Sequence, residues 1–138
     1  ARFDEYTTDS PVLIGDNPDR SGNSLTQAPD WSISGAAQYT IPAATGELSL
    51  RGEFFWTSRI YFDPFNRDII SQGPQAVFNA LITWQSNDRN WRLSGYMKNI
   101  GDVTRLGSAV QGTALVGYPV LATLDPPRTY GIEVTRRF

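Results

Sequence analysis

The sequence repeats one pattern five times, in which apolar and polar residues alternate at every second position. Successive side chains of a β-strand point to opposite faces of its sheet, so this period of two predicts strands with two different faces. The runs cover residues 31–41, 48–62, 75–85, 91–100 and 128–138. Residues 1–6 fit the stub of one more strand. We therefore expect an all-β fold of about five to six strands.

The lengths of the connections indicate how these strands follow one another. The segments PAATG (residues 42–46) and SNDRN (residues 86–90) have hairpin length and turn-forming residues. The other connections, at residues 7–29, 63–74 and 101–127, are long and rich in Gly, Pro, Asn and Asp. This order predicts an antiparallel up-and-down meander, with both short turns and Phe138 at one end and the long loops at the other. Bacterial outer-membrane barrels show the same asymmetry, with short periplasmic turns and long extracellular loops.

The two faces of the expected sheet differ in character. Apolar residues should project from a convex face toward lipid, namely Ile33, Leu50, Phe54, Ile82, Leu93, Met97, Ile132 and Val134. Charges of both signs should lie on the concave face, namely Arg51, Glu53, Arg92, Lys98 and Glu133. Several aromatics stand at strand ends, where barrels carry aromatic girdles, namely Trp31, Tyr39, Phe62, Trp84, Trp91, Tyr130 and Phe138. Charges spread over one face suit a wide lumen that holds water or a plug.

Composition narrows the function classes. The chain has no Cys and no His, which leaves out disulfides, thiolate chemistry and the commonest metal ligand and general base. A net charge of −2 without a basic run argues against a nucleic-acid partner. There is no stretch of about 18 apolar residues and no signal peptide, and the single Met is Met97. We expect a mature or excised piece of a longer protein, with no enzymatic activity and no cofactor.

Three segments carry a resemblance to a known family. They are NSLTQAPDWSISGAAQYTIP (residues 23–42), WRLSGYMKNIGD (residues 91–102) and PPRTYGIEVTRRF (residues 126–138). In order and spacing they resemble the C-terminal end of a TonB-dependent outer-membrane receptor, a 22-stranded transmembrane β-barrel with an N-terminal plug. The resemblance implies that residues 1–138 are the C-terminal portion of the barrel domain, without the plug and most of the barrel. Arg136 departs from the pattern, because the family more often has an aromatic or apolar residue there.

The resemblance also implies a function and partners. The function is energy-coupled uptake of a scarce nutrient across the outer membrane of a Gram-negative bacterium, with siderophore-iron, cobalamin or an oligosaccharide as substrate. The partners are outer-membrane lipid and lipopolysaccharide, the rest of the barrel and the plug, the TonB complex through that plug, and a small-molecule substrate. The barrel-assembly machinery is a further partner, because it recognises a C-terminal signal in the family. Here that signal is Phe138 together with Val134, Ile132 and Tyr130.

The long loops supply the candidate ligand contacts. In the family the outer loops grip the substrate, which points here to Tyr61, Phe65, Asn66, Arg67 and Tyr118. The alternative is that these loops pack against one another as a lid.

Other hypotheses for the chain stay open. Asp9, Asp16 and Asp19 are carboxylates in one loop that suit Ca²⁺, although their spacing is not that of an EF-hand. Glu53 and Glu133 are candidates for a glycosidase carboxylate pair, or more simply for lumen charges that contact a plug. A soluble carbohydrate-binding β-sandwich is the rival to the membrane barrel, since its strands alternate in the same way.

Overall fold

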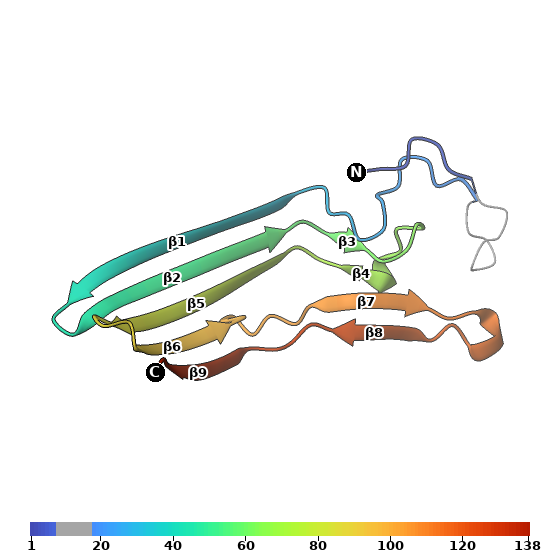
Figure 1. Cartoon of the computed structure of the whole chain (residues 1–138). Coiled ribbons are helices and arrows are strands. Elements are labelled where there is room, and N and C mark those ends of the chain that lie inside the picture. The colour runs from blue at the N-terminus through green and yellow to red at the C-terminus, as the bar shows by residue number, and fades with distance from the viewer. Residues whose placement is uncertain (8–17) are drawn as a thin grey trace. The chain divides into compact units, whose positions relative to one another are not determined.

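The computed structural model describes residues 1–7 and 18–138, and strands make up most of the structure. The chain divides into two compact units (Figure 1). The sheet unit is made of Ile33–Trp56, Ala76–Val103 and Pro126–Phe138, and the loop unit of Ala1–Ser32, Thr57–Gln75 and Thr104–Asp125. No helix in the described part of the chain is long and apolar enough to cross a membrane.

The sheet unit holds one five-stranded sheet. Its strands are β1 (Ser32–Ala43), β2 (Gly46–Thr57), β5 (Gln75–Ser86), β6 (Trp91–Lys98) and β9 (Thr129–Arg136). They lie in the order β1-β2-β5-β6-β9, and β6 pairs antiparallel with both of its neighbours. The expected meander is therefore confirmed. The sheet does not close on itself, because β1 and β9 are its two edges.

The strand register confirms that the sheet has two different faces. Residues paired across neighbouring strands share a face. One cross-strand row is Trp84–Leu93–Val134 and the next is Thr83–Ser94–Glu133. On the polar face the Thr83 and Ser94 hydroxyls are hydrogen-bonded at 3.1 Å. The alternation in the sequence thus becomes one apolar face and one mainly polar face, which also carries Leu81 and Tyr96.

The apolar face is bare. Seven of its eight predicted residues are 38–80% exposed, and Phe54 is half-buried against Phe78, with the two ring centroids 5.0 Å apart. The buried hydrophobics of the described residues are Phe62 and Ile70, and both belong to the loop unit. The sheet unit therefore has no hydrophobic core of its own, and the predicted band of exposed apolar residues is confirmed.

One end of the sheet gathers both short turns and the end of β9 (Figure 1). The Asn87 side chain donates to the Ala44 carbonyl at 3.0 Å, which joins the two turns. The Arg137 backbone N–H donates to the Asn90 carbonyl at 2.8 Å, which joins the second turn to the end of β9. In that turn the Ser86 hydroxyl donates to Asp88 and holds the pKa of this carboxyl below its usual value, and the Asn90 backbone N–H acts in the same direction. The predicted placement of the turns with Phe138 is confirmed.

Several predicted boundaries are wrong. Pro42 belongs to β1 and not to the turn, and it is the next-to-last residue of this strand. The run at residues 48–62 breaks after Thr57, and Phe62 is a buried core residue and not a girdle aromatic. Residues 1–6 form no strand but make an isolated bridge between Arg2 and Ser24.

The long connections also contain pairing that the sequence did not suggest. One holds β3 (Ile60–Tyr61), the 3-10 helix η1 (Asp68–Ile70) and β4 (Ser71–Gln72), and the other holds β7 (Leu106–Gln111), the 3-10 helix η2 (Ala114–Val116) and β8 (Val120–Leu124). β3 pairs with β4, and β7 pairs with β8, each as a two-stranded antiparallel sheet.

A buried asparagine closes the connection from β6 to β9. Asn99 has a positive φ of 51°, and its side chain accepts from the Val103 N–H at 2.9 Å and donates to the Val103 carbonyl at 3.0 Å. The Asn99 backbone N–H donates to the Asn79 side chain at 3.0 Å. Asp102 then accepts from the Arg128 N–H at 2.8 Å. The NIGD segment therefore ties the end of β6 to the start of β9.

Replacing Asn99 should destabilise this connection. Asn99→Ala removes the side-chain partners of buried backbone groups, and each buried group left unpaired costs about 1–3 kcal/mol. We expect a lower free energy of unfolding, measured by denaturant titration of the full-length protein that contains these residues. Asn87→Ala is the control, because the Asn87 side chain is exposed and its loss should cost little. Equal effects of the two changes would contradict the assigned role of Asn99.

Gly46 gives a second stability prediction, because a Cβ atom there would lie 2.0 Å from the Gln85 backbone oxygen. Gly46→Ala should push β2 away from β5 and cost about 1–3 kcal/mol, as overpacking usually does. Gly52→Ala in the same strand is the matched control, since a Cβ there meets nothing within 4 Å. The measurement is the temperature at which the folded full-length protein loses its compact gel mobility. A similar temperature for both variants would refute the close approach.

Candidate functional site

The β3–β4 hairpin forms the centre of the loop unit. Tyr61 pairs with Ser71, and the Phe62 N–H donates to the Ile70 carbonyl at 3.1 Å. Phe62 and Ile70 are the buried hydrophobics of the described residues, so they anchor the hairpin by its base. Its tip, residues 63–69, carries three of the predicted ligand contacts, Phe65, Asn66 and Arg67.

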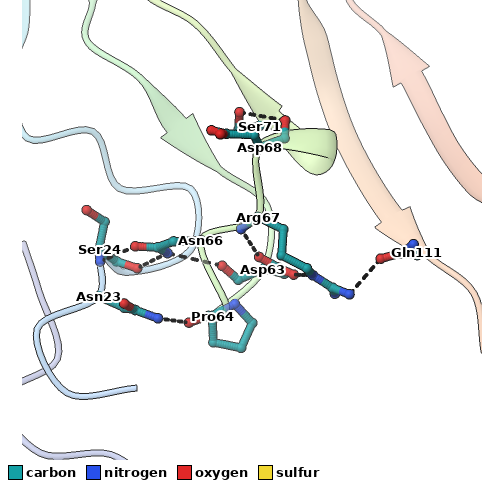
Figure 2. Close-up of polar contacts among 9 residues, drawn as sticks. All are labelled: Asn23, Ser24, Asp63, Pro64, Asn66, Arg67, Asp68, Ser71 and Gln111. Atoms are coloured by element: carbon teal, nitrogen blue, oxygen red, sulfur yellow. Dashed lines mark hydrogen bonds and ion pairs between the residues drawn. The ribbon is translucent and has the colours of Figure 1, made fainter. Parts of the chain in front are cut away.

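Arg67 joins the hairpin tip to a second loop. Its Nε lies 2.5 Å from Asp63 Oδ2, and both side chains are largely buried, with 16% and 10% of their surface exposed. Arg67 Nη1 donates to the Gln111 side chain at 2.6 Å (Figure 2). Gln111 is the last residue of β7, so one guanidinium connects two segments that are far apart in the sequence.

Asn66 joins the hairpin tip to a third segment. Its φ of 55° is positive, a conformation that Asn adopts more readily than most residues. The Asn66 side chain accepts from the Ser24 N–H at 2.6 Å and donates to the Ser24 carbonyl at 3.0 Å (Figure 2). Beside it the Asn23 side chain donates to the Pro64 carbonyl at 2.8 Å. The residues around Asn66 and Arg67 thus form a polar cluster that holds three loop segments together.

Phe65 lies against two guanidinium groups. Its ring centroid is 3.9 Å from Arg20 Cζ and 4.8 Å from Arg67 Cζ, within the range of cation–π attraction. Arg20 is 3% exposed, and its Nε and Nη2 have no hydrogen-bond partner among residues 1–7 and 18–138. The ring therefore supplies part of the stabilisation for a buried cation. The neighbouring Asp19 accepts hydrogen bonds from Ser21, which lower the pKa of the Asp19 carboxyl.

Tyr61 and Asn66 line a polar hollow of about 260 Å³ in the loop unit. The other lining residues are Arg2, Gly22, Ser24, Asp30, Ser58 and Arg59. The ion pairs beside the hollow are open to solvent: Arg2 lies 3.9 Å from Asp30, and Arg59 pairs with Asp68. The hollow is thus lined by two guanidinium groups, each already paired with a carboxylate, and by a phenol, groups that can donate hydrogen bonds to a ligand rich in oxygen.

Tyr118 lies apart from these residues, in the turn between η2 and β8. Its φ is 54°, and its N–H donates to the Thr113 carbonyl at 3.1 Å. The structure therefore gathers Tyr61, Phe65, Asn66 and Arg67 in the central hairpin of the loop unit and places Tyr118 in another turn. Asn66 and Arg67 hold loops together, as the lid alternative expects, and the contact of the five residues with a ligand stays a prediction.

Sequence reasoning missed several partners of these residues. Asp63 is the one partner close in the sequence, because it lies only four residues before Arg67 in the same loop. Gln111, Arg20 and Asn23 carry no local signal, since their contacts join residues that are far apart in the sequence.

The structure also bears on the other predicted residues. Tyr130, Ile132 and Val134 are exposed on the apolar face of β9, and Phe138 lies two residues beyond the end of this strand.

Glu53 and Glu133 lie on β2 and β9, three strand spacings apart, or ~14 Å. A glycosidase pair needs about 5–9.5 Å, so that hypothesis is wrong.

The calcium hypothesis falls partly outside the described residues, because Asp9 and Asp16 lie there. Among the residues that the structure describes, no group of three or more acidic side chains is placed to hold a metal ion.

A comparison with known protein families shows to which family the chain belongs. The sequence model of the family "TonB dependent receptor-like, beta-barrel" matches residues 1–100. The chain belongs to this family. A search of curated proteins gave no match.

Two solved TonB-dependent receptors share the fold. The ferric yersiniabactin uptake receptor FyuA from Yersinia pestis matches 86% of this chain with a TM-score of 0.76 and 23% identity. The ferric preacinetobactin receptor BauA from Acinetobacter baumannii matches 85% of this chain with a TM-score of 0.65 and 18% identity. This chain covers only 18% and 16% of those two proteins, so it spans a small part of a receptor of their length. An open five-stranded sheet with an apolar and a polar face is what a segment of a TonB-dependent receptor barrel should be.

The Arg67 ion pair yields a prediction for the receptor loops. Arg67→Ala leaves the Asp63 carboxylate buried without its cation, which costs about 3–5 kcal/mol when such a pair is broken. Hydrogen exchange in residues 60–72 should accelerate, while the sheet unit stays protected. Arg59→Ala is the matched control, because its pair with Asp68 is exposed (46% and 82%) and worth about 0–1 kcal/mol. Unchanged exchange in Arg67→Ala would show that the cluster does not order the loops.

Proposed function

We propose that this chain is the C-terminal portion of the β-barrel of an outer-membrane receptor for TonB-dependent, energy-coupled nutrient uptake. The observation that carries the proposal is the family match over residues 1–100. The bare apolar face supports it, because a membrane barrel needs such a surface toward lipid. In this proposal the strands outside the chain close the barrel, and a plug fills the lumen and links the receptor to the TonB complex.

Under this proposal the polar face lines the lumen. Its charges are already partly paired: Glu53 accepts from Arg51 Nε at 2.9 Å and from the Asn79 side chain at 3.4 Å. Such side chains would contact water or the plug, and a lipid contact would be costly for them. The soluble β-sandwich is the weaker proposal, because the sheet unit buries no hydrophobic side chain against a second layer.

A ferric siderophore is the substrate class that we propose within this function. FyuA and BauA, the two structures described above, are named as receptors for ferric siderophores. The hollow beside Arg59 and Tyr61 supports the choice, because it offers cationic and phenolic groups to an oxygen-rich anionic chelate. Cobalamin and oligosaccharides are the remaining classes.

Uptake by the full receptor tests the proposal. The receptor would be expressed in a Gram-negative strain that lacks its own siderophore receptors, and the cells would be given a panel of labelled ferric siderophores, cobalamin and oligosaccharides. We expect accumulation of one ferric siderophore that disappears in a strain without TonB. Equal accumulation with and without TonB would contradict the proposed energy coupling.

Phe138 yields a prediction for assembly. Burial of one aromatic side chain contributes only about 1.5–3 kcal/mol, so a large loss of receptor after its deletion points to recognition by the barrel-assembly machinery. Deleting Phe138 should sharply reduce heat-modifiable, folded receptor in outer-membrane fractions, with unchanged uptake per folded molecule. Tyr39→Ala, at another exposed aromatic residue, is the control and should leave the folded amount nearly unchanged. Normal folded levels without Phe138 would exclude it as the assembly signal.

A further inference from the structure

Arg136 is a cation on the apolar face of the sheet. It is the last residue of β9 and pairs in register with Trp91 of β6. Since side chains alternate along a strand, Arg136 shares its face with Ile132 and Val134, and all three are exposed. A guanidinium group beside exposed apolar side chains needs a polar partner for its N–H groups.

Two aromatic rings hold the Arg136 side chain. Its Cζ lies 4.9 Å from the Trp91 ring centroid and 4.7 Å from the Phe138 ring centroid. The face of an aromatic ring at this distance attracts a guanidinium group. The N–H groups at the edge of the guanidinium plane stay available as hydrogen-bond donors. The guanidinium is therefore positioned in advance for a planar, multidentate hydrogen-bond acceptor such as phosphate.

The neighbouring charges leave Arg136 without a protein anion. None of the ion pairs among the described residues includes Arg136. The nearby Asp88 carboxylate accepts from Ser86 and Asn90, and Glu133 stands in the row of the polar face. Arg136 is exposed and therefore free to pair with an anion from outside the described residues.

We propose that Arg136, held between Trp91 and Phe138, binds the phosphate of an anionic phospholipid in the periplasmic leaflet of the outer membrane. The inference rests on the proposed function, because it requires the apolar face to meet lipid. The short turns mark the periplasmic end of a bacterial barrel, and Arg136 lies at that end, where headgroups are found. Leu93 and Val134, exposed in the adjacent row, would meet the acyl chains of the same lipid, which free phosphate lacks.

Lipid titration of the full receptor tests the inference. Purified receptor in detergent would be titrated with phosphatidylglycerol and, separately, phosphatidylcholine, and lipid-bound species would be counted by native mass spectrometry. Arg136→Gln should weaken the tightest phosphatidylglycerol binding about fivefold, the effect of one basic residue near an anionic surface, and should weaken phosphatidylcholine binding less, because its choline cation neutralises the phosphate. Arg136→Lys keeps the charge and should lose less. Arg92→Gln is the control, because Arg92 lies on the polar face and donates to Gln85.

The following results would count against the inference. Equal phosphatidylglycerol affinity in the wild-type receptor and Arg136→Gln would overturn it, and displacement of the lipid by inorganic phosphate would show a free-phosphate site instead. Loss of folded receptor in Arg136→Gln without a change in lipid binding would assign the residue to assembly. The amount of wild-type receptor in outer-membrane fractions separates the two proposals, because its absence there would refute the proposed function itself.

Discussion

The structure depends on strand register. The alternation of apolar and polar residues produces two different faces only when neighbouring strands are aligned so that their apolar residues share one face. Sliding β9 by one residue against β6 would move Glu133 onto the apolar face now held by Ile132 and Val134. Local devices fix the alignment at both ends of the sheet. Asn99 and Asp102 tie the start of β9 to the end of β6, and the Asn90 carbonyl holds Arg137 at the other end.

A sheet with both faces in use leaves ligand recognition to the loops. Under the proposed function the apolar face meets lipid and the charged face lines the lumen, so neither face is left to recognise a ligand. The loop unit has its own order, based on the buried pair Phe62 and Ile70 and on the polar contacts of Asn66 and Arg67. If these loops bind the substrate as proposed, such order reduces the conformational freedom that they lose on binding, which favours affinity.

The sequence predicted those parts of the fold that are written in local patterns. The alternation in β5, β6 and β9 and the positions of the two short turns were enough to derive the meander and its faces. The hairpins β3–β4 and β7–β8 could not be derived, because they are short and their pairing joins residues such as Ser108 and Thr123 across a long turn. The contacts of the candidate site could not be derived either. The sequence singled out Arg67 as a candidate, but its hydrogen bond to Gln111 spans 44 residues and forms only when the loops are folded.

The alternating environment of β9 is the most direct test of the account. The sequence has no Cys, so Ile132, Glu133, Val134 and Thr135 can each be replaced by Cys, one at a time, in a receptor without other cysteines, and spin-labelled in lipid vesicles. The account predicts that labels at positions 132 and 134 collide mainly with lipid-soluble oxygen, and labels at positions 133 and 135 mainly with a water-soluble nickel chelate. Access of the chelate to all four labels, without alternation, would contradict a sheet that separates lipid from a polar lumen.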